Sequence, residues 1–285
     1  MNETDVVLTG LPRSGTTLTC SLLNKLPDTV ALHEPMQGVE HSDVTDHHAL
    51  AQDVKRFFDE QRASIHERGR ALSRNIDGVV PDNPFGGDRS AKGVRPKIDA
   101  MGEIDIDKVL SDRFMLVIKH TNRFAPMLEG LVELFPVYAL VRNPVATIAS
   151  WGTIEAGLRR GRSGPAGRVA LDLNERMDRF DDPLDRQICL LGWFFEQFHR
   201  HLPERSIIQY ETLVASGGRA LSVVRPEAAQ LDEPLTSRNT NELYDHQQML
   251  RIGERLLKTD GAYWESYSKA QVEQLLGELE QTAPA

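Results

Sequence analysis

Cysteine is scarce in this sequence, with Cys20 and Cys189 among 285 residues. Two thiols so far apart in the chain form no disulfide framework, and neither stands in the spacing of a metal-binding motif. A reducing compartment suits such a chain best. We therefore expect a cytoplasmic protein without a cysteine-based metal site.

Long apolar runs are missing as well. No run reaches the roughly 20 residues that a membrane-spanning helix requires. The first residues, from Met1 to Asp5, contain no basic stretch followed by an apolar one, so no export signal is expected. The sequence therefore predicts no membrane partner.

Positive charge is in the minority: 33 Lys and Arg residues stand against 42 Asp and Glu residues, which gives a net charge of −9. This balance argues against nucleic acid as a partner, because phosphate backbones are bound by basic surfaces. An anionic ligand must instead meet a local group of cations. The positions of individual arginines are therefore informative.

The length and the hydrophobic pattern predict one α/β domain over residues 1–285. Continuous apolar runs are typical of strands that are buried on both faces. Helical segments separate the runs, which indicates βαβ units and a central parallel sheet of about five strands with helices on both faces. The expected strands are residues 5–9, 29–32, 114–118, 137–141 and 206–209.

Two stretches between these elements are expected to cap a substrate site, at residues 36–100 and 157–186. The first contains a helix expected after Ser42, followed at 75–99 by a segment rich in proline, glycine and charge. The second begins with a Gly/Arg-rich stretch at 157–168, which we expect to be a mobile loop. Further helices are expected at residues 184–201, 241–258 and 269–281.

A glycine-rich turn from Gly10 to Thr17 joins the first strand to the next helix. Such a turn points several backbone N–H groups at one spot, and the helix N-terminus adds partial positive charge, so phosphate or sulfate is its natural occupant. A P-loop nucleotide triphosphatase has lysine before the final Ser or Thr of this turn. Here Thr16 stands in that place, and the cation of the turn is Arg13.

A second anchor follows the strand at 137–141. Arg142 stands at the strand end, and a helix is expected to begin near Pro144. Because ligands gather at the carboxyl ends of parallel strands, Arg142 and Arg13 should share a crevice. Arg142 together with the hydroxyl of Ser150 can form a site for a second phosphate.

These motifs resemble those of sulfotransferases that use 3'-phosphoadenosine 5'-phosphosulfate (PAPS). The segment from Pro12 to Leu18 resembles their 5'-phosphosulfate loop. Arg142-Asn143-Pro144 with Ser150 resembles their 3'-phosphate motif, with the same spacing from arginine to serine. Tyr210-Glu211-Thr212-Leu213 is similar to a Tyr-Glu-Asp-Leu segment whose tyrosine lies close to the adenine. The three motifs keep the order of the family.

The resemblance implies a P-loop-like fold, PAPS as donor substrate, adenosine 3',5'-bisphosphate as product and no need for a metal. Many cytosolic members carry a C-terminal Arg-Lys-Gly phosphate clamp that is absent here, and Arg238 is our candidate for its replacement. The residues expected to bind the donor are Pro12, Arg13, Ser14, Gly15, Thr16, Thr17, Arg142, Ser150, Tyr210 and Arg238.

Sulfuryl transfer to a hydroxyl needs a base beside the acceptor and positive charge on the departing oxygen, here from Arg13. Glu34 is the favoured base, since Glu34-Pro35 resembles the Glu-Pro of several carbohydrate and bacterial members. Burial is expected to raise its pKa. His120, placed like the catalytic histidine of cytosolic steroid and phenol enzymes, is the alternative base or an acceptor-positioning group. Lys119 adds positive charge, although strand alternation should turn it away from His120.

Other functions stay open on the sequence alone. A P-loop-type kinase acting on a small molecule would require magnesium and ATP, and the missing loop lysine speaks against it. A non-catalytic nucleotide-binding protein would tolerate the loss of Glu34 and of His120. The acceptor is expected to be a small or carbohydrate-like molecule with a hydroxyl or amine, and its identity is not readable. Whether the chain forms a homodimer is also open.

Overall fold

The computed structural model describes residues 4–36, 46–87, 90, 94–154 and 157–282. Its central sheet has five parallel strands in the order β2-β5-β1-β6-β7. This confirms the expected α/β class and the expected parallel sheet. The strands are β1 (Asp5–Gly10), β2 (Thr29–His33), β5 (Met115–Lys119), β6 (Val137–Val141) and β7 (Ile207–Gln209).

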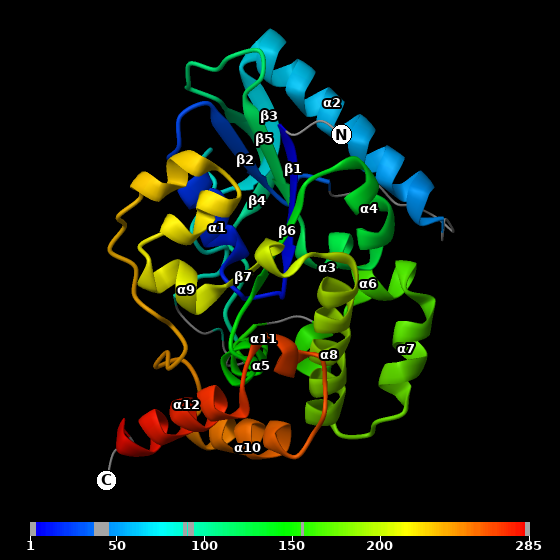
Figure 1. Cartoon of the computed structure of the whole chain (residues 1–285), viewed down its shortest axis with the longest axis vertical. Coiled ribbons are helices and arrows are strands. Elements are labelled where there is room, and N and C mark those ends of the chain that lie inside the picture. Colours follow the sequence, from blue (N-terminus) through cyan, green and yellow to red (C-terminus); the bar gives the residue numbers. More distant parts are fainter. Residues whose placement is uncertain (1–3, 37–45, 88–89, 91–93, 155–156, 283–285) are drawn as a thin grey trace.

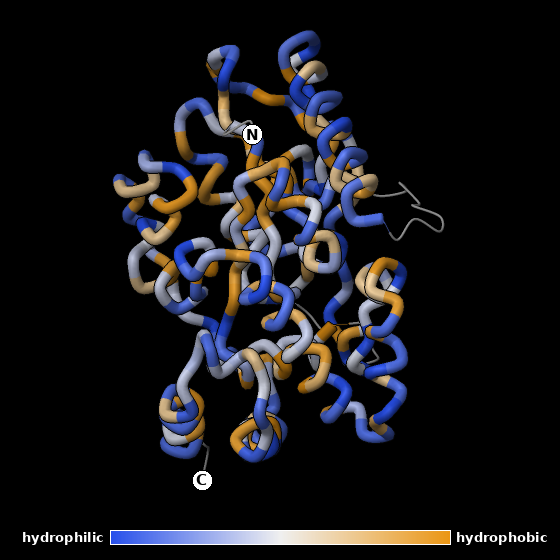
Figure 2. The backbone as a smooth tube through the Cα atoms, turned by 45° about the vertical axis from the view of Figure 1, so that its right-hand side comes forward, coloured by the Kyte–Doolittle hydropathy of each residue, from blue (hydrophilic) through white to orange (hydrophobic). Residues whose placement is uncertain are grey.

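The apolar runs in the sequence form these strands because both faces of the sheet are covered. Every residue of β1, β2 and β5 is buried, and Figure 2 shows hydrophobic residues concentrated along the central strands. In Figure 1, α1 and α9 lie on one side of the sheet, and α2, α3 and α4 lie on the other. The strand predicted at 137–141 matches β6, the prediction for β5 is shifted by one residue, and the other three predicted strands differ from the observed ones by one residue at one end.

Helices make up most of the remaining structure. The predictions at 184–201, 241–258 and 269–281 correspond to α8, α10 and α12, and Figure 1 shows α10 and α12 side by side. Within the described residues, no helix is both long and apolar enough to cross a membrane. The helices are α1 (Thr16–Leu23), α2 (His47–Arg68), α3 (Thr121–Phe124), α4 (Leu128–Leu134), α5 (Pro144–Gly152), α6 (Gly164–Val169), α7 (Leu171–Asp178), α8 (Pro183–His201), α9 (Tyr210–Ala215), α10 (His246–Leu257), α11 (Tyr263–Ser266) and α12 (Lys269–Thr282).

Helix α2 is the long polar helix that the sequence predicted, although Ser42 itself lies outside the described residues. Its N-cap is Asp46, whose carboxylate accepts from the amides of His48 and Ala49. The apolar side, which includes Leu50 and Phe58, packs against α4 and β5. The helix therefore covers the sheet.

A second, two-stranded sheet was not predicted. It pairs β3 (Arg70–Asn75) with β4 (Ala100–Asp105) in antiparallel fashion. Residues of β4 are largely exposed and its sequence is Ala-Met-Gly-Glu-Ile-Asp, so it gives no apolar run to recognise. The hydroxyl of Ser73 accepts a hydrogen bond from the amide of His33, at 3.0 Å, which joins this hairpin to β2.

We expected a loop at 157–168, and this prediction is wrong for much of the segment. Gly157–Arg160 forms a 3₁₀ turn, and α6 begins at Gly164. The hydroxyl of Ser163 caps α6 by accepting from the amide of Ala166, and Pro165 lies in its first turn. Serine at an N-cap and proline at the start favour a helix, even in a glycine-rich stretch.

Candidate active site

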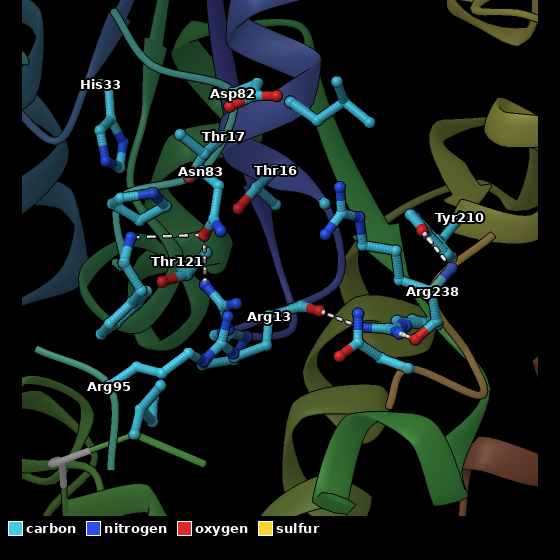
Figure 3. Close-up of a pocket in the computed structure, with 18 of the residues that line it drawn as sticks. Arg13, Thr16, Thr17, His33, Asp82, Asn83, Arg95, Thr121, Tyr210 and Arg238 are labelled. Atoms are coloured by element: carbon cyan, nitrogen blue, oxygen red, sulfur yellow. Dashed lines mark hydrogen bonds between the residues drawn. The ribbon is translucent and has the colours of Figure 1, made fainter. Parts of the chain in front are cut away.

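A cavity of about 490 Å³ lies at the carboxyl edge of the central sheet. Each of the five strands delivers a residue to its wall, because parallel strands end at the same edge. In Figure 3, Arg13 and Asn83 lie on one side of the cavity, and Tyr210 and Arg238 lie on the other. The residues that follow the strands and line the cavity are Pro12, Glu34, Thr121, Arg142 and Tyr210.

The turn after β1 is bent in the way that an anion cradle requires. Gly15 has φ +92°, and a Cβ there would lie 2.9 Å from a ring carbon of Tyr210. Gly15 precedes α1 without a side-chain cap, so the amides of the first helical turn have no side-chain acceptor. Gly15, Thr16 and Thr17 line the cavity. A turn of this shape can hold an anion at the start of a helix.

Arg13 lies in the turn with neutral hydrogen-bond partners. Its Nε donates to the hydroxyl of Ser150 at 3.3 Å, and a terminal nitrogen donates to Asn83 Oδ1 at 3.4 Å. Its guanidinium also lies 4.5 Å from the ring centre of Phe85. Burial, and next the charge of Arg95, lower the pKa of Arg13 from 12.5 to about 9. An anion in the cavity would offset this desolvated charge.

Arg142 lines the same cavity as Arg13, as expected of residues at the carboxyl ends of parallel strands. A guanidinium has five N–H donors, and most of those of Arg142 are used within the protein. The Nε donates to Asn239 Oδ1 at 2.9 Å, and the terminal nitrogens donate to the carbonyls of Arg13 and Arg238 and to the hydroxyl of Tyr244. Arg142 therefore joins the β1 turn to the segment that precedes α10.

The hydroxyls of the two serines in the predicted motifs lie behind the cavity wall. Ser14 donates to the backbone carbonyls of Leu11 and Leu140, and Ser150 accepts from Arg13. Both serines are fully buried, and neither lines the cavity. These hydroxyls shape the turn and hold Arg13, and a direct contact of either with the donor stays a prediction.

Tyr210 and Arg238 form the opposite wall. The Tyr210 ring lies 4.7 Å from the guanidinium carbon of Arg142, and its hydroxyl accepts from the Arg238 amide at 3.0 Å. Arg238 is exposed, and its side chain extends toward Thr16 at the start of α1 (Figure 3). The sequence pointed to Arg238 only as a substitute for a missing clamp, and the structure places it on the cavity wall.

Glu34 lies in the cavity with φ +47° and with the side chain 19% exposed. Its Oε1 accepts from Lys119 Nζ at 2.8 Å, and Lys97 Nζ lies 3.5 Å from Oε2. Burial raises the pKa of Glu34, but the charges of Lys119, His33, His120 and Lys97 together hold it well below 4.5. The expected rise of this pKa is therefore wrong, because the surrounding cations outweigh burial.

His120 is placed less favourably for catalysis than Glu34. It is buried beside Phe124, its Nε2 accepts a hydrogen bond from the Met36 amide at 3.1 Å, and it does not line the cavity. Burial lowers its pKa well below 6.5. A role as base would require the bond to Met36 to break. Lys119, in contrast, lines the cavity.

Several cavity residues were missed by sequence reasoning because their charge alone does not distinguish them from surface residues. Their signal was proximity in space, which depends on the segment that connects β3 to β4 and on the segment before α10. Among the described residues, six basic side chains and two carboxylates line the cavity, so it is locally positive in an acidic protein. The residues missed are His33, Asp82, Asn83, Arg95, Lys97 and Tyr244.

The two expected capping stretches contribute unequally to the wall. From 36–100, the described residues Asp82 to Phe85, Arg95 and Lys97 line the cavity, whereas α2 contributes none. From 157–186, Leu158 lines it. The helix after Ser42 was expected to shape the pocket, and this is wrong because its apolar face packs on the sheet and α4.

No family model and no curated protein matches the sequence. Among solved structures, the chain is similar to a sulfotransferase from Mycobacterium avium, at 13% identity and a TM-score of 0.34. That match covers 99% of this chain and 77% of the other. At so low a TM-score the superposition assigns no residue of the site. The structure defines an α/β protein with a cavity lined by basic residues at the carboxyl edge of a parallel sheet.

Proposed function

We propose that this protein is a sulfotransferase that transfers a sulfuryl group from PAPS to a hydroxyl or amine of a small or carbohydrate-like acceptor. One observation carries the proposal: a single cavity holds the turn after β1, with Arg13 and Arg142, together with the carboxylate of Glu34. The two cationic anchors suit a donor with two charged groups, and the carboxylate suits an acceptor that must lose a proton.

The cavity residues fit the donor. The amides at the start of α1 and Arg13 would hold the phosphosulfate, and Arg238 with the remaining donor of Arg142 would hold the 3'-phosphate. Tyr210 would lie beside the adenine. A volume of about 490 Å³ is in the range of ligand pockets. The six basic side chains on the wall outnumber the two carboxylates, as binding of a polyanion requires.

In the proposed reaction the acceptor oxygen attacks the sulfur, the bond from sulfur to the phosphate oxygen breaks, and adenosine 3',5'-bisphosphate leaves. The acceptor proton passes to Glu34. Because the pKa of Glu34 is held low, the carboxylate is ionised at neutral pH but is a weak base. Proton transfer is then expected late, when the forming bond to sulfur has made the acceptor proton acidic. Arg13 stabilises the negative charge on the departing oxygen.

Ligand-induced stabilisation tests the donor. Adenosine 3',5'-bisphosphate at about one hundred times its Kd should add about 2.7 kcal/mol to the free energy of unfolding. We expect this rise without magnesium, and a smaller one with ATP. A larger stabilisation by ATP with magnesium, followed by phosphate transfer, would instead establish a kinase.

Turnover tests the reaction itself. Incubation with radiolabelled PAPS and a metabolite extract should transfer label to an acceptor in the wild type and not in Glu34→Gln. Arg219→Ala is the matched control, because Arg219 is an exposed arginine that pairs with Asp232 and does not line the cavity. Absence of labelled product in the wild type together with absence of stabilisation by the bisphosphate would refute the proposal.

A further inference from the structure

Four ionisable side chains form a continuous chain of polar contacts that ends in the cavity. Asp99 Oδ2 lies 3.1 Å from His33 Nε2, and His33 Nδ1 lies 3.3 Å from Lys119 Nζ. Lys119 Nζ donates to Glu34 Oε1 at 2.8 Å. The side chains of His33 and Asp99 are 1% and 0% exposed, so both are shielded from bulk solvent, although His33 borders the cavity.

The fold fixes both ends of this series of side-chain contacts. His33 and Lys119 are the last residues of β2 and β5 and are register partners, so their side chains leave the sheet on the same face. The Glu34 amide donates to the Lys119 carbonyl at 2.9 Å, which continues the pairing by one residue. Asp99 precedes β4 and accepts from Arg74 at 3.1 Å. The hairpin β3–β4 therefore brings Asp99 to the end of β2.

The contacts define the tautomer of His33. Burial and the charge of Lys119 lower the pKa of His33 to about 4, so its ring is neutral at physiological pH. Burial raises the pKa of Asp99, but its bond to His33 and the charges of Lys97 and Arg74 lower it, which keeps it a carboxylate. A carboxylate only accepts, so His33 Nε2 carries the hydrogen and Nδ1 offers a lone pair to Lys119.

We propose that His33, oriented by Asp99, is a positioning residue whose Nδ1 holds the ammonium of Lys119 against Glu34. A lysine side chain is long and flexible, and one bond to Glu34 leaves it free to rotate. The second bond, to His33, fixes it. The effect on catalysis rests on the proposed function, in which Glu34 is the base. The contact between Lys119 and Glu34 does not depend on that function.

Other charges also face Glu34, so the loss of His33 is expected to weaken the site and not to abolish it. Lys97 Nζ lies 3.5 Å from Glu34 Oε2, and Arg74 Nε lies 4.0 Å from it. His120, in the segment after β5, also lowers the pKa of Glu34, but only at acidic pH where its own ring is protonated. Of these groups, Lys119 is the nearest to Glu34 and is the one that contacts His33.

Two substitutions test the two ring nitrogens of His33 separately. In His33→Asn, the new amide oxygen lies near the place of Nδ1 and can still accept from Lys119, but the bond to Asp99 is lost. In His33→Gln, the new amide nitrogen lies near the place of Nε2 and keeps the bond to Asp99, but the bond to Lys119 is lost. We expect kcat to fall about tenfold or more in His33→Gln and much less in His33→Asn, with the KM for PAPS unchanged in both.

The acidic limb of the kcat/KM profile should move to higher pH in His33→Gln, because the pKa of Glu34 rises when Lys119 is released. An effect on packing alone predicts equal losses in the two variants, or a smaller loss in His33→Gln. Either result would overturn the proposal. His48→Gln is the control, because His48 is an exposed histidine that pairs with Glu133 on the surface.

Two measurements do not depend on sulfuryl transfer. Nitrogen chemical shifts of wild-type His33 should show the tautomer with hydrogen on Nε2, without titration near pH 6.5. Carbon NMR of the Glu34 carboxyl should show a higher pKa in His33→Gln than in the wild type or His33→Asn. The opposite tautomer, or an unchanged Glu34 pKa, refutes the proposal even in an active sulfotransferase. If both hold without PAPS turnover, the proposed function fails and the positioning role stands.

Discussion

A terminal nitrogen of Arg142 donates a hydrogen bond to the backbone carbonyl of Arg13, at 3.0 Å. The same guanidinium donates to the carbonyl of Arg238 and to Asn239 Oδ1, so it holds two segments that are distant in sequence. Arg142 is buried, whereas Arg238 is exposed at the cavity wall. The two arginines should therefore respond differently to substitution.

Replacement of the buried arginine is expected to destabilise the fold. Arg142→Lys keeps the charge but loses the planar fork that reaches Arg13, Arg238 and Asn239. Several buried acceptors then lose their donor, which we expect to lower the free energy of unfolding by about 3 kcal/mol. Urea unfolding measures this decrease in the free energy of unfolding. A change smaller than about 0.5 kcal/mol would contradict the scaffolding role.

Replacement of the exposed arginine should change binding and leave stability unaltered. Arg238→Ala removes a cation from the cavity wall, and its backbone contacts with Tyr210 and Arg142 are kept. We expect the affinity for adenosine 3',5'-bisphosphate to fall about tenfold, the value of one charge-assisted hydrogen bond. Calorimetric titration measures this, with Arg219→Ala as control. Equal affinity in both variants would place the 3'-phosphate elsewhere.

Substitution of the carboxylate in the cavity should separate chemistry from donor binding. Glu34→Gln keeps the size of the side chain and an acceptor for Lys119, but removes the proton acceptor. Turnover is expected to fall by about a thousandfold, within the range for a general base, while the Kd of the bisphosphate changes little. Retained turnover in this variant, with loss in His120→Asn, would assign the base to His120.

Much of the fold and part of the site could be predicted from the sequence. The apolar runs of β5 and β6 indicated the sheet because buried strands need apolar residues on both faces. The sheet then placed Arg13, Arg142 and Tyr210 at one edge, since parallel strands end together. Local sequence was sufficient to predict a site residue wherever that residue directly follows a strand of the sheet.

The features that were missed depend on contacts between distant segments. The hairpin β3–β4 is polar and exposed on β4, so no periodicity revealed it. Without the hairpin, nothing linked Asp99 to His33. The direction of the Glu34 pKa shift was wrong because it depends on Lys97 and Lys119, which come from two other parts of the chain. The pKa of a buried group depends on all of its charged neighbours, including those that are distant in sequence.

The conformation of the turn after β1 gives a further prediction. Gly15→Ala places a methyl group 2.9 Å from the Tyr210 ring, at a φ of +92° that L-residues rarely adopt. We expect a loss of stability of about 2 kcal/mol and a much weaker response to the bisphosphate. Gly164→Ala is the control, because a Cβ there meets no atom within 4 Å. Similar melting temperatures for the two variants would show that the turn tolerates the methyl group.

The buried histidine predicts a pH dependence of stability. The pKa of His33 is about 4 in the folded protein and 6.5 as the ordinary value. Between these pH values the unfolded chain binds more protons than the folded one, so stability rises with pH in this window and is lost on acidification. The pKa difference corresponds to about 3 kcal/mol over the whole window, and to about 2 kcal/mol between about pH 6.5 and about pH 5.

His33→Asn removes this titrating group. Urea unfolding at about pH 7 and about pH 5 should therefore show a smaller acid-induced loss in His33→Asn than in the wild type, by about 2 kcal/mol. His48→Gln removes an exposed histidine and should keep the wild-type dependence. His120, whose pKa burial also lowers, titrates in all three proteins and cancels in the comparison. Parallel stability curves for His33→Asn and the wild type would mean that His33 ionises in the folded protein as it does in the unfolded chain, which its burial and the neighbouring charge of Lys119 oppose.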